Sequence, residues 1–332
     1  MNKRLLSVTS LIIAFLVVAF FFGNGQQKTK NKDVVTVGIL QLVTHPALDQ
    51  IHEGVVKGLA DSGYTEGKNL KINYQNAQAN QANLKTMAQD FENKGTDLTV
   101  GIATPAALSL AKVANQKAPV ILAGITNPVG AKLADSVDKP GHNITGVSGN
   151  SPYEKQATLF KEVLPKAKKI GIISTTSDAG GTYNAKRMTS ALEKKGYQVK
   201  NYTISSTNDM LQVANTMAGE VDAVYAPQDN SVATAMKTLV GACRANKVPV
   251  IPSNDTMVKD GGLISYSQSQ YEIGYQAGLM AGQVLKGKNP ATFPIRSVDK
   301  GSYAVNLQTA SDLGIQLPEN MVQEAKQNQE VY

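Results

Sequence analysis

The sequence predicts an α/β protein made of two Rossmann-like lobes joined by a hinge of several chain segments. Apolar, β-branched runs alternate with amphipathic helical patterns, which is typical of a doubly wound parallel sheet. The alternation restarts at residue 169, so a second set of strand–helix units follows the first. The stretch beyond residue 269 is too short for a third lobe and must add to the existing two.

The first strand–helix unit sets the pattern that later units repeat. Residues 34–42 form an almost unbroken apolar run rich in β-branched side chains, which is typical of a central strand covered on both faces. Thr44 or His45 can cap the helix that follows, and Pro46 suits its first turn because a missing N–H costs nothing there. Apolar residues then recur at helical spacing until Gly63, which can end the helix in a left-handed conformation.

The same patterns predict the remaining elements. In the first half, strands are predicted at 70–75, 97–102, 119–122 and 143–147, with helices at 79–94, at 105–114 behind an N-cap at Thr104, and from Asn127 onward. In the second half, strands are predicted at 169–174, 198–204, 222–226, 248–251 and 262–266, with helices at 183–195, 210–218 and 232–246. The tail is predicted to hold a helix at 270–286 and a strand-like piece at 303–307, and residues 313–326 end the chain. Both sheets should have the flavodoxin-like strand order.

This order of elements predicts how the chain divides. The N-terminal lobe is expected to comprise residues 34–148 plus 268–300, and the C-terminal lobe residues 149–267 plus 301–332. Because the chain then crosses between the lobes more than once, hinge segments are expected near Gly149, Ser267 and Gly301.

The first 33 residues have the pattern of an export leader. Lys3 and Arg4 precede an apolar run that is long enough to span a bilayer as a helix. The best cleavage candidate is Gly25, but a good small-residue site is absent, and no cysteine follows to carry a lipid. The leader is therefore either cleaved near Gly25 or kept as an N-terminal membrane anchor, which is the favoured interpretation. Residues 26–33 form a polar tether, and the globular part is expected at the extracytoplasmic face of the membrane.

Composition excludes several classes of protein. A hydrophobic content of 42% with 18% charged residues indicates a globular chain. The net charge of +7 comes from lysines scattered beside acids, with no aromatic-flanked basic run, so it is interpreted as solvated surface and not as a nucleic-acid interface. Cys243 cannot form an internal disulfide, and the three histidines give no metal-binding pattern. We expect no metal and no cofactor.

Catalytic motifs are also missing. The first strand is not followed by a GxGxxG turn, and neither a phosphate-binding P-loop nor a GxSxG nucleophile elbow occurs in the sequence. With three histidines, one cysteine and no paired carboxylate motif, the sequence predicts a binding protein and not an enzyme.

Uncharged polar residues recur where predicted strands meet helix starts. Thr104 and the pair Thr126–Asn127 occupy two such places in the first half, and Ser177 and Ser253 occupy similar places in the second. Helix N-termini bind carboxylates through free N–H groups and a partial positive charge. Asp229 is the acidic residue of the same layer and suits an ammonium group. N–H groups beside a carboxylate would fit an α-amino acid, although each residue alone could be an ordinary cap or turn residue.

Six stretches of the sequence resemble the substrate-binding proteins of ABC importers, and in particular the tryptophan and aromatic amino acid binders of Gram-positive bacteria. The stretches cover nearly all of the chain after the leader, in the expected order: VGILQLVTHPALDQIHEGVVKGLADSGY, VGIATPAA, AGITNPVGA, NITGVSG, VYAPQDNSVATA and GLISYSQSQYEIGYQAGLMAGQVLKGKNP.

This resemblance implies a monomeric two-lobed receptor of the periplasmic-binding-protein type I fold, which closes on an aromatic L-amino acid, tryptophan first. It would deliver the ligand to a permease and an ATPase in the membrane. The implied ligand-binding residues are Gln41, Thr104, Thr126, Asn127, Ser177, Asp229 and Asn230, with Tyr266 as a candidate for stacking on the ligand ring. Two departures from the family matter. Many relatives carry a lipid on a cysteine that this chain lacks, and many have Asp in place of Asn127.

Other functions remain open at this point. The same fold could serve as a sensory domain, or as a receptor for a nucleoside or a branched amino acid. A transcription regulator with this core is disfavoured by the leader and by the missing helix-turn-helix pattern.

Overall fold

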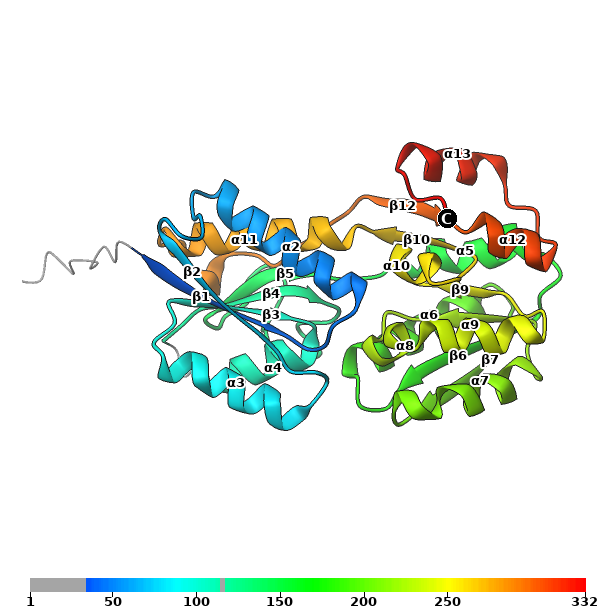
Figure 1. Cartoon of the computed structure of the whole chain (residues 1–332), viewed down its shortest axis with the longest axis horizontal. Helices are drawn as coiled ribbons and strands as arrows, with labels where there is room; N and C mark the ends of the chain where they lie inside the picture. Colours follow the sequence, from blue (N-terminus) through cyan, green and yellow to red (C-terminus); the bar gives the residue numbers. More distant parts are fainter. Residues whose placement is uncertain (1–33, 114–116) are drawn as a thin grey trace, which may run out of the picture. The chain divides into compact units, whose positions relative to one another are not determined.

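The structure is a computed structural model that describes residues 34–113 and 117–332. The leader and tether at 1–33, with the predicted anchor, lie outside the described residues, as does the end of the helix predicted at 105–114. Residues 35–332 form one compact unit (Figure 1). No helix within the described ranges is long and apolar enough to cross a membrane.

The first lobe is built on a six-stranded parallel sheet. Its strands have the order β11-β5-β4-β3-β1-β2, so the predicted flavodoxin-like order is confirmed and β11 adds a sixth strand at one edge. These strands are β1 (Val35–Gln41), β2 (Leu70–Asn76), β3 (Leu98–Ile102), β4 (Val120–Ile125), β5 (Ile144–Ser148) and β11 (Arg296–Ser297). The helices are α2 (Pro46–Asp61), α3 (Gln81–Asn93), α4 (Thr104–Val113) and α11 (Gln270–Leu285), with the short η2 (Pro290–Thr292). Figure 1 shows α2 and α11 on one face of the sheet and α3 and α4 on the other.

The second lobe has a four-stranded parallel sheet in the order β7-β6-β8-β9. Its strands are β6 (Lys169–Thr175), β7 (Gln198–Ile204), β8 (Ala223–Ala226) and β9 (Val250–Pro252). Its helices are α5 (Tyr153–Val163), α6 (Ala179–Lys194), η1 (Thr207–Asp209), α7 (Met210–Ala218), α8 (Asn230–Thr234), α9 (Met236–Ala245), α10 (Asp255–Lys259), α12 (Leu307–Leu313) and α13 (Glu319–Gln327).

The strand predicted at 262–266 does not complete this second sheet. It is β10 (Ile264–Gln268), which pairs antiparallel with β12 (Gly301–Val305) in a separate two-stranded ribbon. Just before β10, the backbone N–H of Leu263 still donates to Val250 O of β9 at 2.7 Å. The returning tail supplies a better partner along the whole length of β10, because β9 has only three residues. Ser267 and Gly301, both predicted hinge positions, lie in this ribbon.

The helix start predicted at Asn127 differs from the structure. No helix begins at Asn127 in the described chain; its side-chain Oδ1 accepts from Gly130 N at 3.0 Å and so closes a turn. The left-handed conformation of Lys132, with φ of 59°, follows that turn and prevents a helix. In the tail, Gly314 ends α12 in the left-handed region, and α13 begins directly after Pro318.

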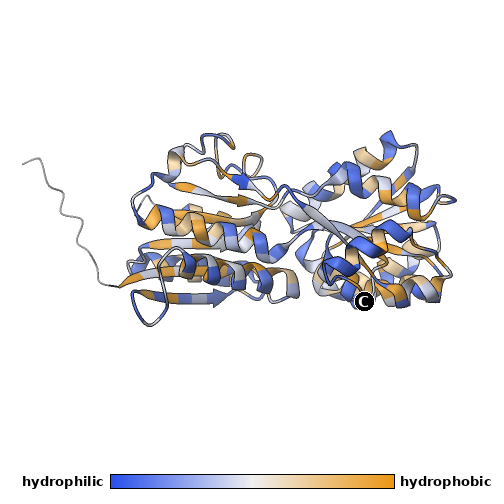
Figure 2. Cartoon of the chain, turned by 90° about the horizontal axis from the view of Figure 1, so that it is seen from above, coloured by the Kyte–Doolittle hydropathy of each residue, from blue (hydrophilic) through white to orange (hydrophobic). Residues whose placement is uncertain are grey.

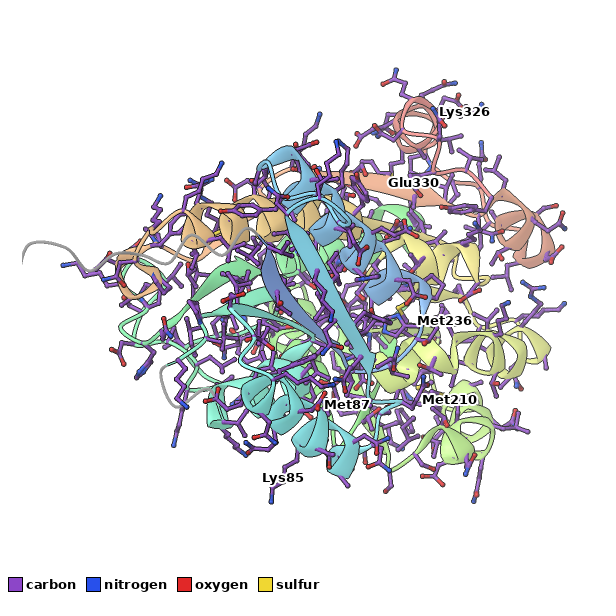
Figure 3. All side chains as sticks on the ribbon, turned by 60° about the vertical axis from the view of Figure 1, so that its left-hand side comes forward. Lys85, Met87, Met210, Met236, Lys326 and Glu330 are labelled. Atoms are coloured by element: carbon purple, nitrogen blue, oxygen red, sulfur yellow. The ribbon has the colours of Figure 1, made fainter. Side chains whose placement is uncertain are left out.

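Hydrophobic side chains cover both faces of each sheet. Alternate residues of β8 point to opposite faces, so Tyr225 packs in one cluster with α5 and α6, and Val224 in another with α7 and α9. Met210 and Met236 belong to the second cluster (Figure 3), whereas Lys85 on α3 is exposed. Figure 2 shows the same division, with hydrophobic residues concentrated on the strands and polar residues on the outer faces of helices.

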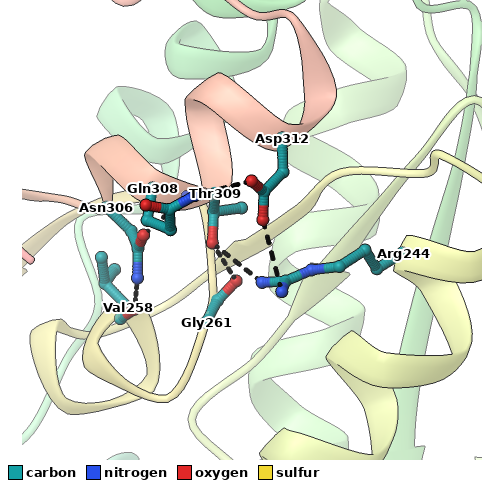
Figure 4. A network of polar contacts seen from close by, with 7 residues as sticks. All are labelled: Arg244, Val258, Gly261, Asn306, Gln308, Thr309 and Asp312. Atoms are coloured by element: carbon teal, nitrogen blue, oxygen red, sulfur yellow. Dashed lines mark hydrogen bonds and ion pairs between the residues drawn. The ribbon is translucent and has the colours of Figure 1, made fainter.

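The tail is attached to the second lobe by a polar network (Figure 4). Asn306 caps α12 by accepting from Thr309 N at 2.8 Å, and its Nδ2 donates to Val258 O at 3.1 Å. The Thr309 hydroxyl donates to Gly261 O, and Arg244 from α9 forms an ion pair with Asp312 at 3.5 Å. The tail therefore adds to an existing lobe, as predicted. The exact boundaries predicted for the two lobes stay a prediction.

Helices α2 and α11 are packed with their backbones in direct contact. A Cβ on Gly54 or Gly58 would overlap backbone oxygens of α11, and one on Gly274 or Gly278 would overlap backbone oxygens of α2. Only glycine allows this approach, because any side chain at the crossing would force the helices apart. Through this contact the chain, which runs from the second lobe through β10 into α11, is attached to the first lobe again.

Gly278→Ala should destabilise the protein by about 1–3 kcal/mol, the usual cost of overpacking a close contact. Gly241 on α9 is the matched control, since a Cβ there would meet nothing within 4 Å. Gly241→Ala should stabilise by about 0.5–1 kcal/mol because alanine is the better helix former. Chemical denaturation of both variants measures the difference; equal effects would contradict the proposed role of the close contact.

Candidate functional site

The carboxyl ends of the first-lobe strands lie level with one another. Gln41 pairs in register with Ile102, and Ile102 with Ala123, so the residues that follow β1, β3 and β4 reach the same edge of the sheet. Thr104 and Thr126 are both buried at this edge, where 6% and 4% of their surface is exposed. In open α/β sheets this edge carries the ligand site.

The sequence predicted Thr104 as the N-cap of α4, but in the structure Thr104 is the first residue of the helix. The backbone oxygen of Ala103 accepts the first helical hydrogen bond, from Ala107 N at 3.1 Å. Ala103 has a φ of 74°, a left-handed conformation that is uncommon for a residue with a side chain. The Thr104 hydroxyl is therefore not used to cap its own helix.

The second lobe brings the start of α6 against these two threonines. A Cβ placed on Gly180 would lie 3.4 Å from Thr104 Oγ1, 3.5 Å from Thr126 Oγ1 and 3.2 Å from Asp178 Oδ1. Three side-chain oxygens from two lobes thus converge on one point beside a helix N-terminus. The absence of a side chain at Gly180 keeps this point free.

Asp178 and Asp229 are adjacent buried carboxylates, and each caps a helix. Asp229 caps α8 by accepting from Ser231 N and Val232 N, and it also accepts from the backbone N and the hydroxyl of Thr175 at 2.7 and 2.8 Å. Gly181 covers its remaining side, since a Cβ on that residue would overlap Asp229 Oδ2. We predicted from the sequence that Asp229 would meet a ligand ammonium, but in the structure both of its carboxylate oxygens accept hydrogen bonds from protein donors.

Burial, together with the neighbouring Asp178 carboxylate, raises the pKa of Asp229 to about 6. The folded chain therefore takes up this proton as the pH falls through about 6, whereas an unfolded chain does so near the ordinary value of about 3.9. The sign follows from linkage: between these values the folded state binds more protons, so this group favours folding more as the pH falls.

Asn230 connects Asp178 with the first lobe. Its backbone N and its side-chain Nδ2 donate to Asp178 Oδ2 at 3.1 and 2.6 Å, and its Oδ1 lies 3.1 Å from His45 Nε2. His45 is buried at the start of α2, and burial lowers the pKa of its imidazole. A second contact between the lobes joins Asn184 Nδ2 on α6 to Thr126 Oγ1 at 3.5 Å. Asn184 is held in turn by Tyr153, whose hydroxyl donates to its Oδ1 at 2.5 Å.

The other predicted site residues are placed differently. Gln41 is fully buried and donates through Nε2 to Val43 O and to Asp49 Oδ1, with its Oε1 unpartnered among the described residues. Asn127 closes the turn described above, and Ser177 is exposed in the turn before α6. The structure does not bring either one to the point at Gly180.

Tyr266 lies on β10 of the hinge ribbon, and none of the described contacts joins its ring to the residues that converge at Gly180. Its ring packs edge-on against Tyr303, with centroids 5.0 Å apart, and the ammonium of Lys155 lies 3.8 Å above it. A proposed contact of this ring with a ligand stays a prediction.

Four residues of this arrangement were absent from the predicted set: His45, Asp178, Gly180 and Asn184. The glycine-rich run at 178–181 was visible in the sequence, but without a following lysine it did not fit a phosphate loop. Asn184 lies inside a predicted helix, where nothing in the pattern separates it from a surface residue. No cluster of three or more potential metal ligands occurs in the parts of the chain that the structure describes.

The fold and this arrangement of polar groups define a two-lobed binding protein of the periplasmic-binding-protein type I fold. The chain belongs to the ABC transporter substrate-binding protein family, whose sequence profile matches residues 36–329. The function is accordingly that of a substrate-binding protein of ABC-type transport, related to proteins that bind aromatic amino acids.

Three similar proteins are informative. A tyrosine-binding protein of Clostridioides difficile is 34% identical over 293 residues, covering 88% of this chain and 85% of the relative. A crystal structure from Streptococcus pneumoniae in complex with L-Trp is 37% identical, with a TM-score of 0.85 over 88% of this chain and 98% of that chain. The ligand-free, open structure of a substrate-binding protein with adhesive properties from Clostridium difficile is 32% identical, with a TM-score of 0.68 over 86% of this chain and 97% of that chain.

Asp229→Ala should destabilise the protein by about 1–3 kcal/mol, because it removes a cap and leaves buried N–H groups of Thr175 and α8 unpaired. The half-buried Asp209, which accepts from Ser205 N and Ser206 N, is the control. Asp209→Ala should lower the free energy of unfolding by less, about 1 kcal/mol or below. Urea unfolding compares the two variants, and an Asp229→Ala protein as stable as wild type would contradict the structural role.

Proposed function

We propose that this protein is the extracytoplasmic solute receptor of an ABC importer and that it binds an aromatic L-amino acid, tryptophan first, between its lobes. A permease and an ATPase in the membrane would receive the ligand, and the N-terminal segment would hold the receptor at the membrane surface. The protein would act as a monomer and without a cofactor.

The observation that carries this proposal is the convergence of Thr104, Thr126 and Asp178 at Gly180. Two hydroxyls beside the N-termini of α4 and α6 suit the α-carboxylate of an amino acid, because N–H groups and helix dipoles favour an anion there. A buried carboxylate beside them suits the ammonium. Both charges of the amino acid head group would then be met within one small region.

Asp178 is better placed than Asp229 to receive the ammonium. Its Oδ1 accepts only one of the described hydrogen bonds, from Gly181 N at 3.0 Å, and it faces Gly180 and the two threonines. Asp229 stays in the proposal as a positioning residue that orders the starts of α6 and α8. The tyrosine-binding relative and the L-Trp complex support an aromatic side chain on the ligand.

Isothermal titration against the twenty amino acids tests the proposal directly. Tryptophan or tyrosine should bind, and Gly180→Ala should weaken binding at least about tenfold, or about 1.4 kcal/mol, because its methyl group would occupy the head-group position. The Gly241→Ala variant should bind as wild type does. A protein that binds no aromatic amino acid would refute the proposal and would favour a nucleoside or a branched amino acid as the ligand.

Ligand binding should bring the lobes together about the segments near Gly149, Ser267 and Gly301. Two of these positions lie on the β10–β12 ribbon, whose ladder can twist without losing its hydrogen bonds. Small-angle X-ray scattering with and without the amino acid should show a smaller radius of gyration when the ligand is bound. An unchanged radius at saturation would contradict closure.

A further inference from the structure

His45 connects the two lobes through a buried hydrogen bond. The residue precedes α2 of the first lobe, and its Nε2 lies 3.1 Å from Oδ1 of Asn230, the first residue of α8 in the second lobe. Only 7% of His45 is exposed. Any movement that separates the lobes at this edge must break the bond and expose the imidazole to water.

The protonation state of this imidazole follows from its partners. Asn230 Nδ2 donates to Asp178 Oδ2, so Asn230 Oδ1 is the acceptor that faces His45, and His45 Nε2 must carry the hydrogen. The other ring nitrogen, Nδ1, is buried and has no hydrogen-bond partner among the described residues. A second proton on Nδ1 would therefore place a charged N–H in a position without an acceptor, which is strongly unfavourable.

Three carboxylates from the surrounding elements act electrostatically on the ring: Asp49 of α2, Asp178 before α6 and Asp260 after α10. Each favours a charged imidazole, but each is already engaged. Asp49 accepts from Gln41 Nε2 at 2.7 Å, Asp178 accepts from Gly181 and Asn230, and Asp260 forms an ion pair with Lys237. Burial outweighs their attraction, and the pKa of His45 is lowered in this arrangement.

We propose that His45, in its neutral form, locks the lobes together, so that mild acidification opens the receptor and releases its ligand. The inference rests on the proposed function, because release is defined for the amino acid held between the lobes. His45 acts as a positioning residue that holds Asn230 and, through it, Asp178. In the open receptor the ring meets water and can take up a proton at its ordinary pKa of about 6.5.

The direction and size of the effect follow from linkage. The closed form excludes the second proton of His45, so the affinity for the ligand is highest above about pH 6.5. It falls as the pH drops below that value. Each pH unit below that value weakens binding roughly tenfold, until the closed form itself takes up the proton. Between pH 8 and pH 5.5 the dissociation constant should rise about tenfold. The carboxylate and ammonium of a free amino acid keep their charges over most of this window.

Titration calorimetry with tryptophan and tyrosine at pH 8 and pH 5.5 tests the proposal on wild type, His45→Gln and His52→Gln. Wild type and His52→Gln should show the tenfold ratio, because His52 stacks on Tyr74 and has no contact with the second lobe among the described interactions. His45→Gln keeps an amide donor for Asn230 but cannot titrate, so its ratio should fall to about one. A ratio in His45→Gln equal to that of wild type would assign the pH dependence to another group, such as Asp229, and overturn the proposal.

Histidine NMR gives a second measurement that does not depend on the variants. The chain has three histidines, so ring signals can be assigned by comparison with His45→Gln and His52→Gln. With ligand bound, His45 should keep the signature of the Nε2–H tautomer at pH 5.5, and without ligand it should titrate near 6.5. A doubly protonated His45 in the bound protein would overturn the lock. Absence of binding by wild type at pH 8 would instead refute the proposed function.

Discussion

The two-lobed arrangement depends on the close contact between the backbones of α2 and α11. After β10 the chain leaves the second lobe, and α11 packs on the first-lobe sheet, to which β1–β5 have already contributed earlier in the sequence. The glycines Gly54 and Gly58 on α2 and Gly274 and Gly278 on α11 let the two helices approach until backbone atoms touch. Apolar side chains of the two helices, such as Val55 and Ile273, are buried in the same hydrophobic cluster. The contact also fixes the start of α11, and with it the end of the hinge ribbon.

The local patterns were sufficient to predict most of the fold. The run at 34–42 is apolar on both faces because β1 lies in the middle of a sheet covered by helices on each side, and this one feature indicates a parallel α/β protein. Pairing across long distances was not predictable in the same way. Nothing within residues 262–266 indicates that β10 would pair with β12 instead of β9, since the choice depends on β12, which begins only at Gly301. Turns decided by one side chain, such as Asn127 on Gly130 N, also escaped prediction because the same Asn–Pro pattern can begin a helix.

The candidate site shows a different limit. Thr104 and Thr126 were predicted from their position after strands, and the structure places both at the point where the lobes meet. Asp229 was predicted by the same reasoning, but its carboxylate is used by Thr175, Ser231 and Val232. A helix cap and a ligand contact require the same residue types in the same place, so sequence alone cannot separate them. The difference lies in which oxygen is still free, and that depends on neighbours such as Gly181 that come from another part of the chain.

The energies of the contacts between the lobes suit a receptor that must open again. Two hydrogen bonds between side chains join the described parts of the lobes, His45 to Asn230 at 3.1 Å and Asn184 to Thr126 at 3.5 Å. A buried hydrogen bond contributes about 1 kcal/mol net, so these bonds alone favour the closed form only modestly. A ligand shifts such an equilibrium by no more than its difference in affinity for the two forms. Groups that come from both lobes, such as Thr104 and Asp178 around Gly180, provide that difference, because a ligand can contact all of them only when the lobes are together.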